Sequence, residues 1–235
     1  MKLCFFSDIH GNDIAYQAFL KSVENKAIDL MICAGDVCGY YYESDKILTS
    51  IRKIPGMIYI LGNHDKMVLD ILDGKKNEKD MIQRYGNSYL DTAHMLSDDN
   101  VAFLRSVPLM YMLETDDLKI GFYHGGPADP LNMRIYPDTD IQDAPEYQQY
   151  QYIFCGHTHH KMLRKKGKCT IVNPGSVGQQ RDGKGTSYAI FDTKERKLDI
   201  CTFAYDVQAL INKVEQKETN AEMKEKLIEV LLRKR

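Results

Sequence analysis

The chain of 235 residues contains no tryptophan, almost no excess of either charge and no long hydrophobic run. Its formal net charge of -2 argues against a generally basic nucleic-acid binder, so we expect no specific nucleic-acid partner. No apolar stretch approaches the roughly 20 residues of a membrane-spanning helix, and we expect no membrane partner. The apolar start is interrupted by Asp8, which makes it a poor signal peptide. These absences predict a cytoplasmic protein.

Paired cysteine motifs are missing as well. The sequence has six cysteines, and none of them forms a C-x-x-C pair. Five lie in apolar segments, where we expect reduced thiols that act as small hydrophobic side chains. The chain is 43% hydrophobic, which is enough for a sizeable core, and no linker divides it. We therefore expect one domain over residues 1–235.

Short apolar runs that end in Gly, Asp or His are frequent, and such runs predict buried strands. Helical patterns at 12–25 and about 43–53 separate the first three runs, which predicts parallel neighbouring strands. A helical segment without a clear strand follows at about 66–106, and a C-terminal helix is expected at about 219–235. Further strands are expected near 109–115, 118–123, 152–155, 169–172, 187–192 and 197–203.

Polar side chains follow five of these strands at the points where strands of one sheet meet a common edge. They are Asp8, His10, Asp36, Asn63, His64, His124, His157 and His159. Imidazole and carboxylate without thiolate indicate a site for Mn, Fe, Zn or Ni. The ligands are too many for one ion and suit two ions that share a carboxylate. In an extended backbone, the D-x-H and H-x-H spacings point both side chains to one side.

The two remaining histidines are expected outside this site. His94 lies in a helical segment, as a packing or surface residue. His160 would point away from the neighbouring His159 in an extended strand.

The segments "DIHGN", "GDVCGY", "GNHD", "HGGP", "GHTH" and "NPGSVGQ" together resemble the calcineurin-like metallophosphoesterase superfamily. Within it, the chain is most similar to small single-domain bacterial and archaeal phosphodiesterases, over nearly its whole length. The resemblance implies an α/β fold, a four-layer α/β/β/α sandwich of two mixed β-sheets.

The resemblance also implies a role for each polar residue. Asp8, His10 and His159 would bind one metal ion. Asn63, His124 and His157 would bind the other, and Asp36 would bridge the two ions. His64 would be a catalytic histidine that contacts the phosphate or the leaving group. What orients His64 cannot be read from the sequence.

Four further residues carry hypotheses about the substrate. Asn12 either contacts phosphate, as in the family, or caps a helix. Arg181 either steadies a phosphate or is a solvated turn residue. Tyr41 and Tyr42 either stack on a nucleobase or pack in a tyrosine-rich loop.

These features predict a phosphoesterase that uses two divalent metal ions, with Mn favoured over Fe, Ni or Zn, and a metal-bound hydroxide. A phosphodiesterase or nucleotide pyrophosphohydrolase is the leading interpretation, with a small phosphate ester, such as a dinucleoside polyphosphate, as substrate. The alternatives are a phosphomonoesterase or protein phosphatase, and a non-catalytic binding scaffold with the same fold. A leucine-rich C-terminal stripe could pack on the domain or on a second subunit of a homo-oligomer.

Overall fold

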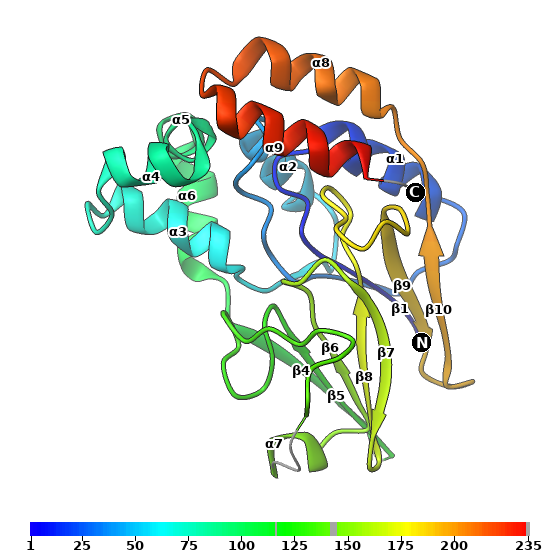
Figure 1. Cartoon of the computed structure of the whole chain (residues 1–235). Helices are drawn as coiled ribbons and strands as arrows, with labels where there is room; N and C mark the ends of the chain where they lie inside the picture. The colour runs from blue at the N-terminus through cyan, green and yellow to red at the C-terminus, as the bar shows by residue number, and fades with distance from the viewer. Residues whose placement is uncertain (116, 142–144, 234–235) are drawn as a thin grey trace.

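The computed structural model describes residues 1–115, 117–141 and 145–233, and it shows two mixed five-stranded sheets packed face to face with helices around them (Figure 1). The first sheet has the order β10-β9-β1-β2-β3, with β1 (Lys2–Phe6), β2 (Leu30–Cys33), β3 (Ile58–Tyr59), β9 (Ser187–Asp192) and β10 (Lys197–Thr202). The second has the order β4-β5-β6-β8-β7, with β4 (Met110–Thr115), β5 (Leu118–Tyr123), β6 (Tyr152–Phe154), β7 (Lys161–Lys166) and β8 (Cys169–Pro174). The predicted α/β fold class is confirmed.

Parallel strands lie in the middle of both sheets. In the first sheet β1 pairs with β2, and β2 with β3, in parallel register. In the second sheet β5, β6 and β8 are parallel to one another. The carboxyl ends of the strands that carry the predicted site therefore share one edge in each sheet.

The sandwich is held together by side chains that alternate along each strand. Leu3 and Phe5 of β1 pack between the sheets against Ile120 and Phe122 of β5. The intervening residues of β1, such as Phe6, face the helices instead. The outer face of the second sheet is covered by residues of the 125–150 segment and by α7 (Pro145–Gln148).

Helices cover the other face of the first sheet and extend beyond it. Those between the first three strands are α1 (Asp13–Val23) and α2 (Ser44–Ile51). A helical block follows with α3 (Asn63–Leu72), α4 (Glu78–Tyr85), α5 (Ser88–Met95) and α6 (Asp98–Ser106). The chain closes with α8 (Val207–Lys217) and α9 (Ala221–Leu232), which lie side by side above the sheets (Figure 1). Within the described residues, every helix falls short of the length and hydrophobicity needed to span a bilayer.

Two elements go beyond the sequence-based expectation. Strand β7 continues directly from the predicted site and forms a hairpin with β8, with Leu163 opposite Val172. The helical block begins at Asn63 rather than at 66, so Asn63 and His64 open α3.

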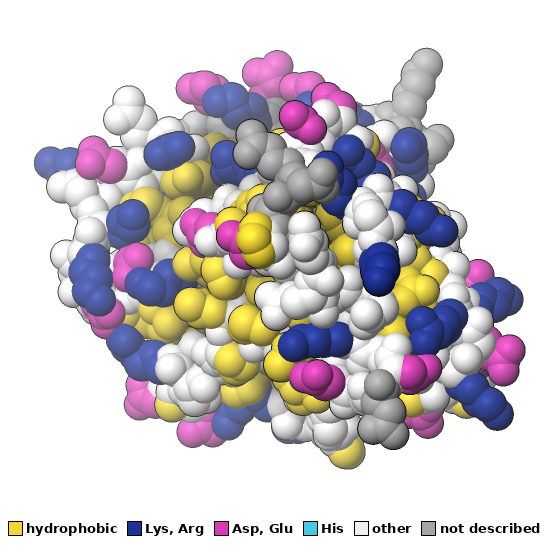
Figure 2. All heavy atoms as spheres, turned by 90° about the horizontal axis from the view of Figure 1, so that it is seen from below, with side chains coloured by type: hydrophobic (Ala, Val, Ile, Leu, Met, Phe, Trp, Pro, Cys, Tyr) yellow, Lys and Arg dark blue, Asp and Glu magenta, His cyan; other side chains and the backbone are white. Residues whose placement is uncertain are grey.

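The face of the molecule seen from below carries Lys, Arg, Asp and Glu side chains interspersed with apolar ones (Figure 2).

Candidate metal centre

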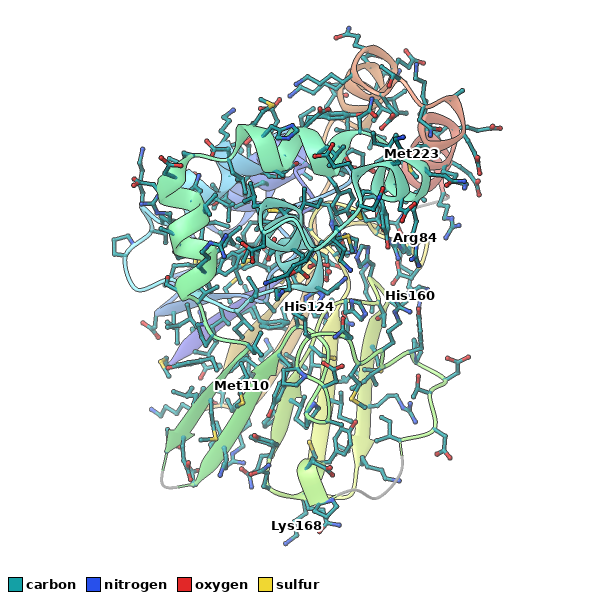
Figure 3. All side chains as sticks on the ribbon, turned by 90° about the vertical axis from the view of Figure 1, so that its left-hand side faces the viewer. Arg84, Met110, His124, His160, Lys168 and Met223 are labelled. Carbon is teal, nitrogen blue, oxygen red and sulfur yellow. The ribbon has the colours of Figure 1, made fainter. Side chains whose placement is uncertain are left out.

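The predicted site residues converge at the carboxyl ends of the strands. His124 directly follows β5 and lies at the upper ends of the second sheet's strands, whereas Lys168 marks the opposite end (Figure 3). Asp8, His10, Asp36, His124 and His159 are all at most 1% exposed. The strand order thus gathers residues that are far apart in the sequence.

The backbone that carries these side chains is left-handed rather than extended. Asp8, His10, Asp36, His157 and His159 have φ between 53° and 66°. The i, i+2 argument from an extended strand was therefore wrong, although each pair does converge. A non-glycine residue in this region is strained and persists only where surrounding contacts fix it. Such strain is typical of functional sites.

Neighbouring loops fix this strained backbone through hydrogen bonds. The amide of Asp8 donates to the carbonyl of Gly35 at 3.0 Å, and the amide of His10 donates to the carbonyl of Asp36 at 2.9 Å. The Ser176 hydroxyl donates to the carbonyl of Asp8 at 2.7 Å. Ser176 of the "NPGSVG" segment therefore has a structural role here.

Two groups of predicted ligands have donor atoms close enough to share an ion. Asp8, His10 and His159 form one, and Asp36, His124 and His157 form the other. Asn63 adds its Oδ1 atom, which lies 2.8 Å from Nε2 of His124. A third grouping joins His10, Asp36 and His64, so geometry alone also permits His64 as a ligand.

Backbone carbonyls orient three of the histidines. Nδ1 of His10 lies 3.0 Å from the carbonyl of Cys38, and Nδ1 of His124 lies 2.7 Å from the carbonyl of Ala34. Nδ1 of His159 faces the carbonyl of Gln179 in the same way. A carbonyl only accepts, so Nδ1 carries a proton, and Nε2 is the nitrogen that faces the cluster and is available to bind a cation. This is the arrangement of metal-binding histidines.

His157 is oriented differently. Its Nδ1 lies 3.1 Å from Nε2 of His124, and its Nε2 accepts from Nε of Arg134 at 3.1 Å. A cation bound through Nδ1 would leave the imidazole proton on Nε2. Nε2 could then no longer accept from Arg134, whose guanidinium would be free for an anion.

Two buried carboxylate oxygens of the cluster, Asp8 Oδ1 and Asp36 Oδ2, have no hydrogen-bond partner among the described residues. They lie 3.3 Å from Nε2 of His159 and of His124, respectively. An unpartnered buried carboxylate oxygen is costly. Divalent cations held between these oxygens and the Nε2 atoms would satisfy both sets of lone pairs, so the residues fit the predicted ions.

The charge states of the cluster suit cation binding. Burial, reinforced by neighbouring histidines, lowers the pKa of His10 well below its usual value, and the same causes act on His64. Burial raises the pKa of Asp8, but His159 outweighs it, so the pKa ends below the usual range. Burial also raises the pKa of Asp36, against the pull of His124. His124 is the exception, because Asp36 outweighs the effect of burial and raises its pKa to about 9. The other shifted imidazoles are neutral near pH 7, as metal ligands must be, and a bound cation would displace the second proton of His124.

His64 is held from both ends. Its backbone amide donates to Asp36 Oδ1 at 2.7 Å, and its Nδ1 contacts the hydroxyl of Tyr89 in α5. Asp65 does not contact the His64 ring, because its carboxylate accepts from the amides of Asp36 and Cys38. Tyr89 is thus the orienting residue that the sequence did not reveal.

A cavity of about 540 Å³ opens above the cluster. Asn63, His64, His157 and His159 line its floor, together with Arg181. This volume is within the usual range for a small-molecule site.

Of the predicted substrate contacts, only Arg181 lines this cavity, half-buried and bonded to the hydroxyl of Tyr40 at 3.2 Å. Asn12 instead caps α1, accepting from the amide of Ala15 at 3.0 Å and donating to the carbonyl of Gly178 at 2.8 Å. Its phosphate-binding hypothesis fails, because both polar atoms are used and the residue is buried.

The stacking hypothesis for the tyrosine-rich loop also fails for Tyr41. Its side chain is fully buried against α8 and α9, so it cannot reach a base. The Tyr42 ring packs in the same cluster and lies 5.4 Å from Nζ of Lys217. The preceding residue, Tyr40, is the one that lines the cavity, with its ring 5.1 Å from that of His64.

The two histidines expected outside the site lie outside both ligand groups. His94 is exposed on α5. His160 packs against the ring of Tyr136, and its Nδ1 lies 2.6 Å from the carbonyl of Thr158.

Comparisons with known proteins agree with this fold. A family model described as the calcineurin-like phosphoesterase superfamily domain matches residues 1–196. The uncharacterized protein MJ0912 of Methanocaldococcus jannaschii is 31% identical over 230 residues, covering 90% of this chain and 91% of that protein. A metallophosphoesterase from Sphaerobacter thermophilus has the same fold, with a TM-score of 0.76 and 22% identity over 99% of both chains. A structure named as a candidate diadenosine tetraphosphatase superposes with a TM-score of 0.57 and 15% identity, covering 87% of this chain and 94% of that one.

Proposed function

The chain belongs to the calcineurin-like phosphoesterase superfamily, and from that premise we propose that it is a two-metal phosphoesterase that cleaves phosphodiester or pyrophosphate-type bonds. The observation that carries the proposal is the pair of unpartnered carboxylate oxygens of Asp8 and Asp36, set among histidine Nε2 atoms. Manganese is the ion we favour, and a cytoplasmic location remains part of the proposal.

The residues would hold two ions in the groups described above, with Asp36 between them and Asn63 completing the second. Bound there, the cations would polarise the phosphoryl oxygens and lower the pKa of a water molecule. The ligands bring only two carboxylates, so the loaded centre stays positive and attracts a phosphate ester.

The chain's own residues then position the ester. Arg181 faces the cavity and can donate to a non-bridging phosphoryl oxygen, as can Arg134 once it leaves His157. Nε2 of His64 lies 3.9 Å from Asp36 Oδ2, at the edge of the cluster. The negative charge of a bound ester would favour the protonated imidazole, which could then give a proton from Nε2 to the departing oxygen while Tyr89 fixes the ring.

A nucleotide is the substrate class that we propose, with dinucleoside polyphosphates as one example. The cavity is large enough for a nucleotide, and Tyr40 and Tyr85 offer ring faces on its lining. A solved structure of the same fold is named as a candidate diadenosine tetraphosphatase, which is consistent with this example.

The non-catalytic scaffold is the second function to be weighed. A scaffold has no need of a complete ligand set, yet every predicted ligand here lies in or next to the cluster. We therefore rank the scaffold below the enzyme.

One experiment separates these proposals. Metal content and hydrolysis of bis(p-nitrophenyl) phosphate and p-nitrophenyl phosphate would be measured with added Mn²⁺, for the wild type and for Asp36→Asn. We expect metal-dependent diester cleavage that falls by about 10³-fold in the variant, since a bridging charge is lost. A protein that binds no metal and cleaves neither ester would refute the proposal. Preferential monoester cleavage would favour the phosphomonoesterase.

A further inference from the structure

The cavity above the metal centre has a basic wall that the two-metal chemistry does not use. Its basic lining residues are Arg84, Arg134, Arg181, Lys226 and Arg233, and its acidic lining residue is Glu229. The whole chain has a net charge of -2, and the lower face mixes both signs (Figure 2). The cavity therefore has a basic lining in a chain whose net charge is slightly negative.

These basic residues fall into two zones. Arg134 and Arg181 contact residues next to the metal centre. Arg84 lies farther out, over the ring of Tyr85 at 5.3 Å, and that ring is 6.3 Å from the ring of His64. Arg84 and Met223, from α4 and α9, lie above the ends of the second sheet's strands (Figure 3).

The basic residues of the outer zone are only partly neutralised by acidic partners. Among the described residues, Arg84 has no carboxylate within ion-pair distance. Nη2 of Arg233 lies 3.9 Å from Oε1 of Glu229, and an ion pair of this length between exposed side chains contributes little stability. Lys226 pairs with Glu222 at 2.6 Å, but both side chains are largely exposed, so the pair exchanges readily for another anion.

The outer zone is nevertheless built on a fixed support. Helices α8 and α9 pack through Leu210, Val214 and Leu227 onto the buried Tyr41. Lys213 Nζ ties α8 to Glu43 at 2.9 Å, and Asn87 at the start of α5 donates to Thr219. Helices α8 and α9 lie beyond residues 1–196 that the family model matches, whereas α4, which carries Arg84, lies within them.

We infer that Arg84, Lys226 and Arg233 form a distal anion subsite that binds a second phosphate group of the substrate, beyond the one held at the metal centre. The inference rests on the proposed function only for the phosphate that is cleaved. A single diester carries one negative charge and engages the inner arginines. A ligand with several linked phosphates also reaches the outer zone, so the subsite selects phosphoanhydride-containing substrates over simple esters.

A binding measurement tests the subsite without turnover. Calorimetry on the full-length, EDTA-treated protein would compare inorganic tripolyphosphate with inorganic phosphate. We expect the wild type to prefer tripolyphosphate. The triple variant Arg84→Ala, Lys226→Ala, Arg233→Ala should lose about tenfold in tripolyphosphate affinity, because three charge-assisted contacts are removed. Lys224→Ala is the matched control, since it lies on α9 outside the cavity lining.

A kinetic comparison on the metal-loaded protein sharpens the test. We expect kcat/KM for diadenosine tetraphosphate to fall about tenfold more than that for bis(p-nitrophenyl) phosphate in the triple variant, mainly through KM. A wild type without preference for tripolyphosphate, or a triple variant that keeps it, would overturn the subsite. If neither diadenosine tetraphosphate nor bis(p-nitrophenyl) phosphate is cleaved, the proposed function is wrong. The calorimetry still shows whether the distal subsite binds tripolyphosphate.

Discussion

The floor and the wall of the cavity are built in opposite ways. The floor, formed by the predicted metal ligands and His64, consists of buried side chains on short strand-end loops. The wall, formed by Arg84, Lys226 and Arg233, consists of exposed side chains on α4 and at the end of α9. A buried, over-determined floor fixes chemistry, because a ligand that moves by an ångström no longer binds its ion. An exposed wall can vary without disturbing that chemistry, so it is suited to set selectivity.

We expect the largest effect of a single substitution on the floor at His64, which lies beside the predicted ligands but is not assigned as one of them. We expect His64→Ala to lower kcat by about 10³-fold, the typical worth of a general acid, while two metal ions are retained. Steady-state kinetics measures the fall in kcat, and metal analysis measures the number of ions that the variant retains. Loss of one ion would show that His64 is a ligand, as its closeness to His10 and Asp36 permits. His94→Ala, an exposed histidine on α5, is the control.

The rigidity of the floor predicts a large effect of a single methyl group at Gly35. Its φ is 75°, and a Cβ atom there would lie 2.2 Å from the backbone nitrogen of Gly62. We expect Gly35→Ala to lower the free energy of unfolding by about 3 kcal/mol, from left-handed strain plus overpacking. Urea denaturation of the EDTA-treated protein measures it.

Gly167 provides the matched comparison, because its φ is 58° and no atom lies within 4 Å of its Cβ position. Gly167→Ala adds strain without a clash, and we expect a loss of about 1 kcal/mol. Equal losses in the two variants would mean that the loop around Gly35 can move aside, contrary to a rigid floor.

The buried histidines of the floor predict an acid-sensitive metal-free protein. Burial, followed by His124, lowers the pKa of His157 from 6.5 to about 3. Below pH 6.5 the unfolded state then binds more protons than the folded state, so acidification favours unfolding. His157 alone would remove about 2 kcal/mol of stability between pH 6.5 and pH 5. His10 and His64 shift in the same direction.

Asp36 and His124 act the other way: burial raises the pKa of Asp36 to about 6, and Asp36 raises that of His124 to about 9 against the effect of burial, so the folded state holds protons at both. These two groups do not outweigh the four histidines whose pKa is lowered, so we expect a net loss, measured by urea denaturation at pH 6.5 and pH 5 with EDTA. Added Mn²⁺ should restore stability at pH 6.5 more than at pH 5, because protons compete with the metal. A metal-free protein equally stable at both pH values would contradict this account.

The same contrast explains what the sequence could predict. The floor was predictable because each ligand sits next to the strand that positions it, as Asp8 follows β1 and His124 follows β5. The wall was not predictable, because nothing near Arg84 in the sequence shows that residues of α9 will line the same cavity. Tyr89 was missed for that reason too: it reaches His64 only through the packing of α5 against α3. Strand β7 was missed because its "KMLRKK" sequence is charged, which is typical of an edge strand with few buried residues.

The smallest expected effect concerns Tyr89, which belongs to the helical part of the molecule but contacts the floor. Tyr89→Phe removes only the hydroxyl that contacts His64 Nδ1. We expect a fall in kcat of about tenfold, because the imidazole loses one orienting bond while the ligands stay in place. The fall should be larger for an ester with an alkoxide leaving group than for one that releases p-nitrophenolate, since the more basic oxygen depends more on a proton from His64. Tyr16→Phe, another fully buried tyrosine in α1, controls for loss of a buried hydroxyl. Equal losses with both leaving groups would show that Tyr89 supports the fold of the site rather than the orientation of His64.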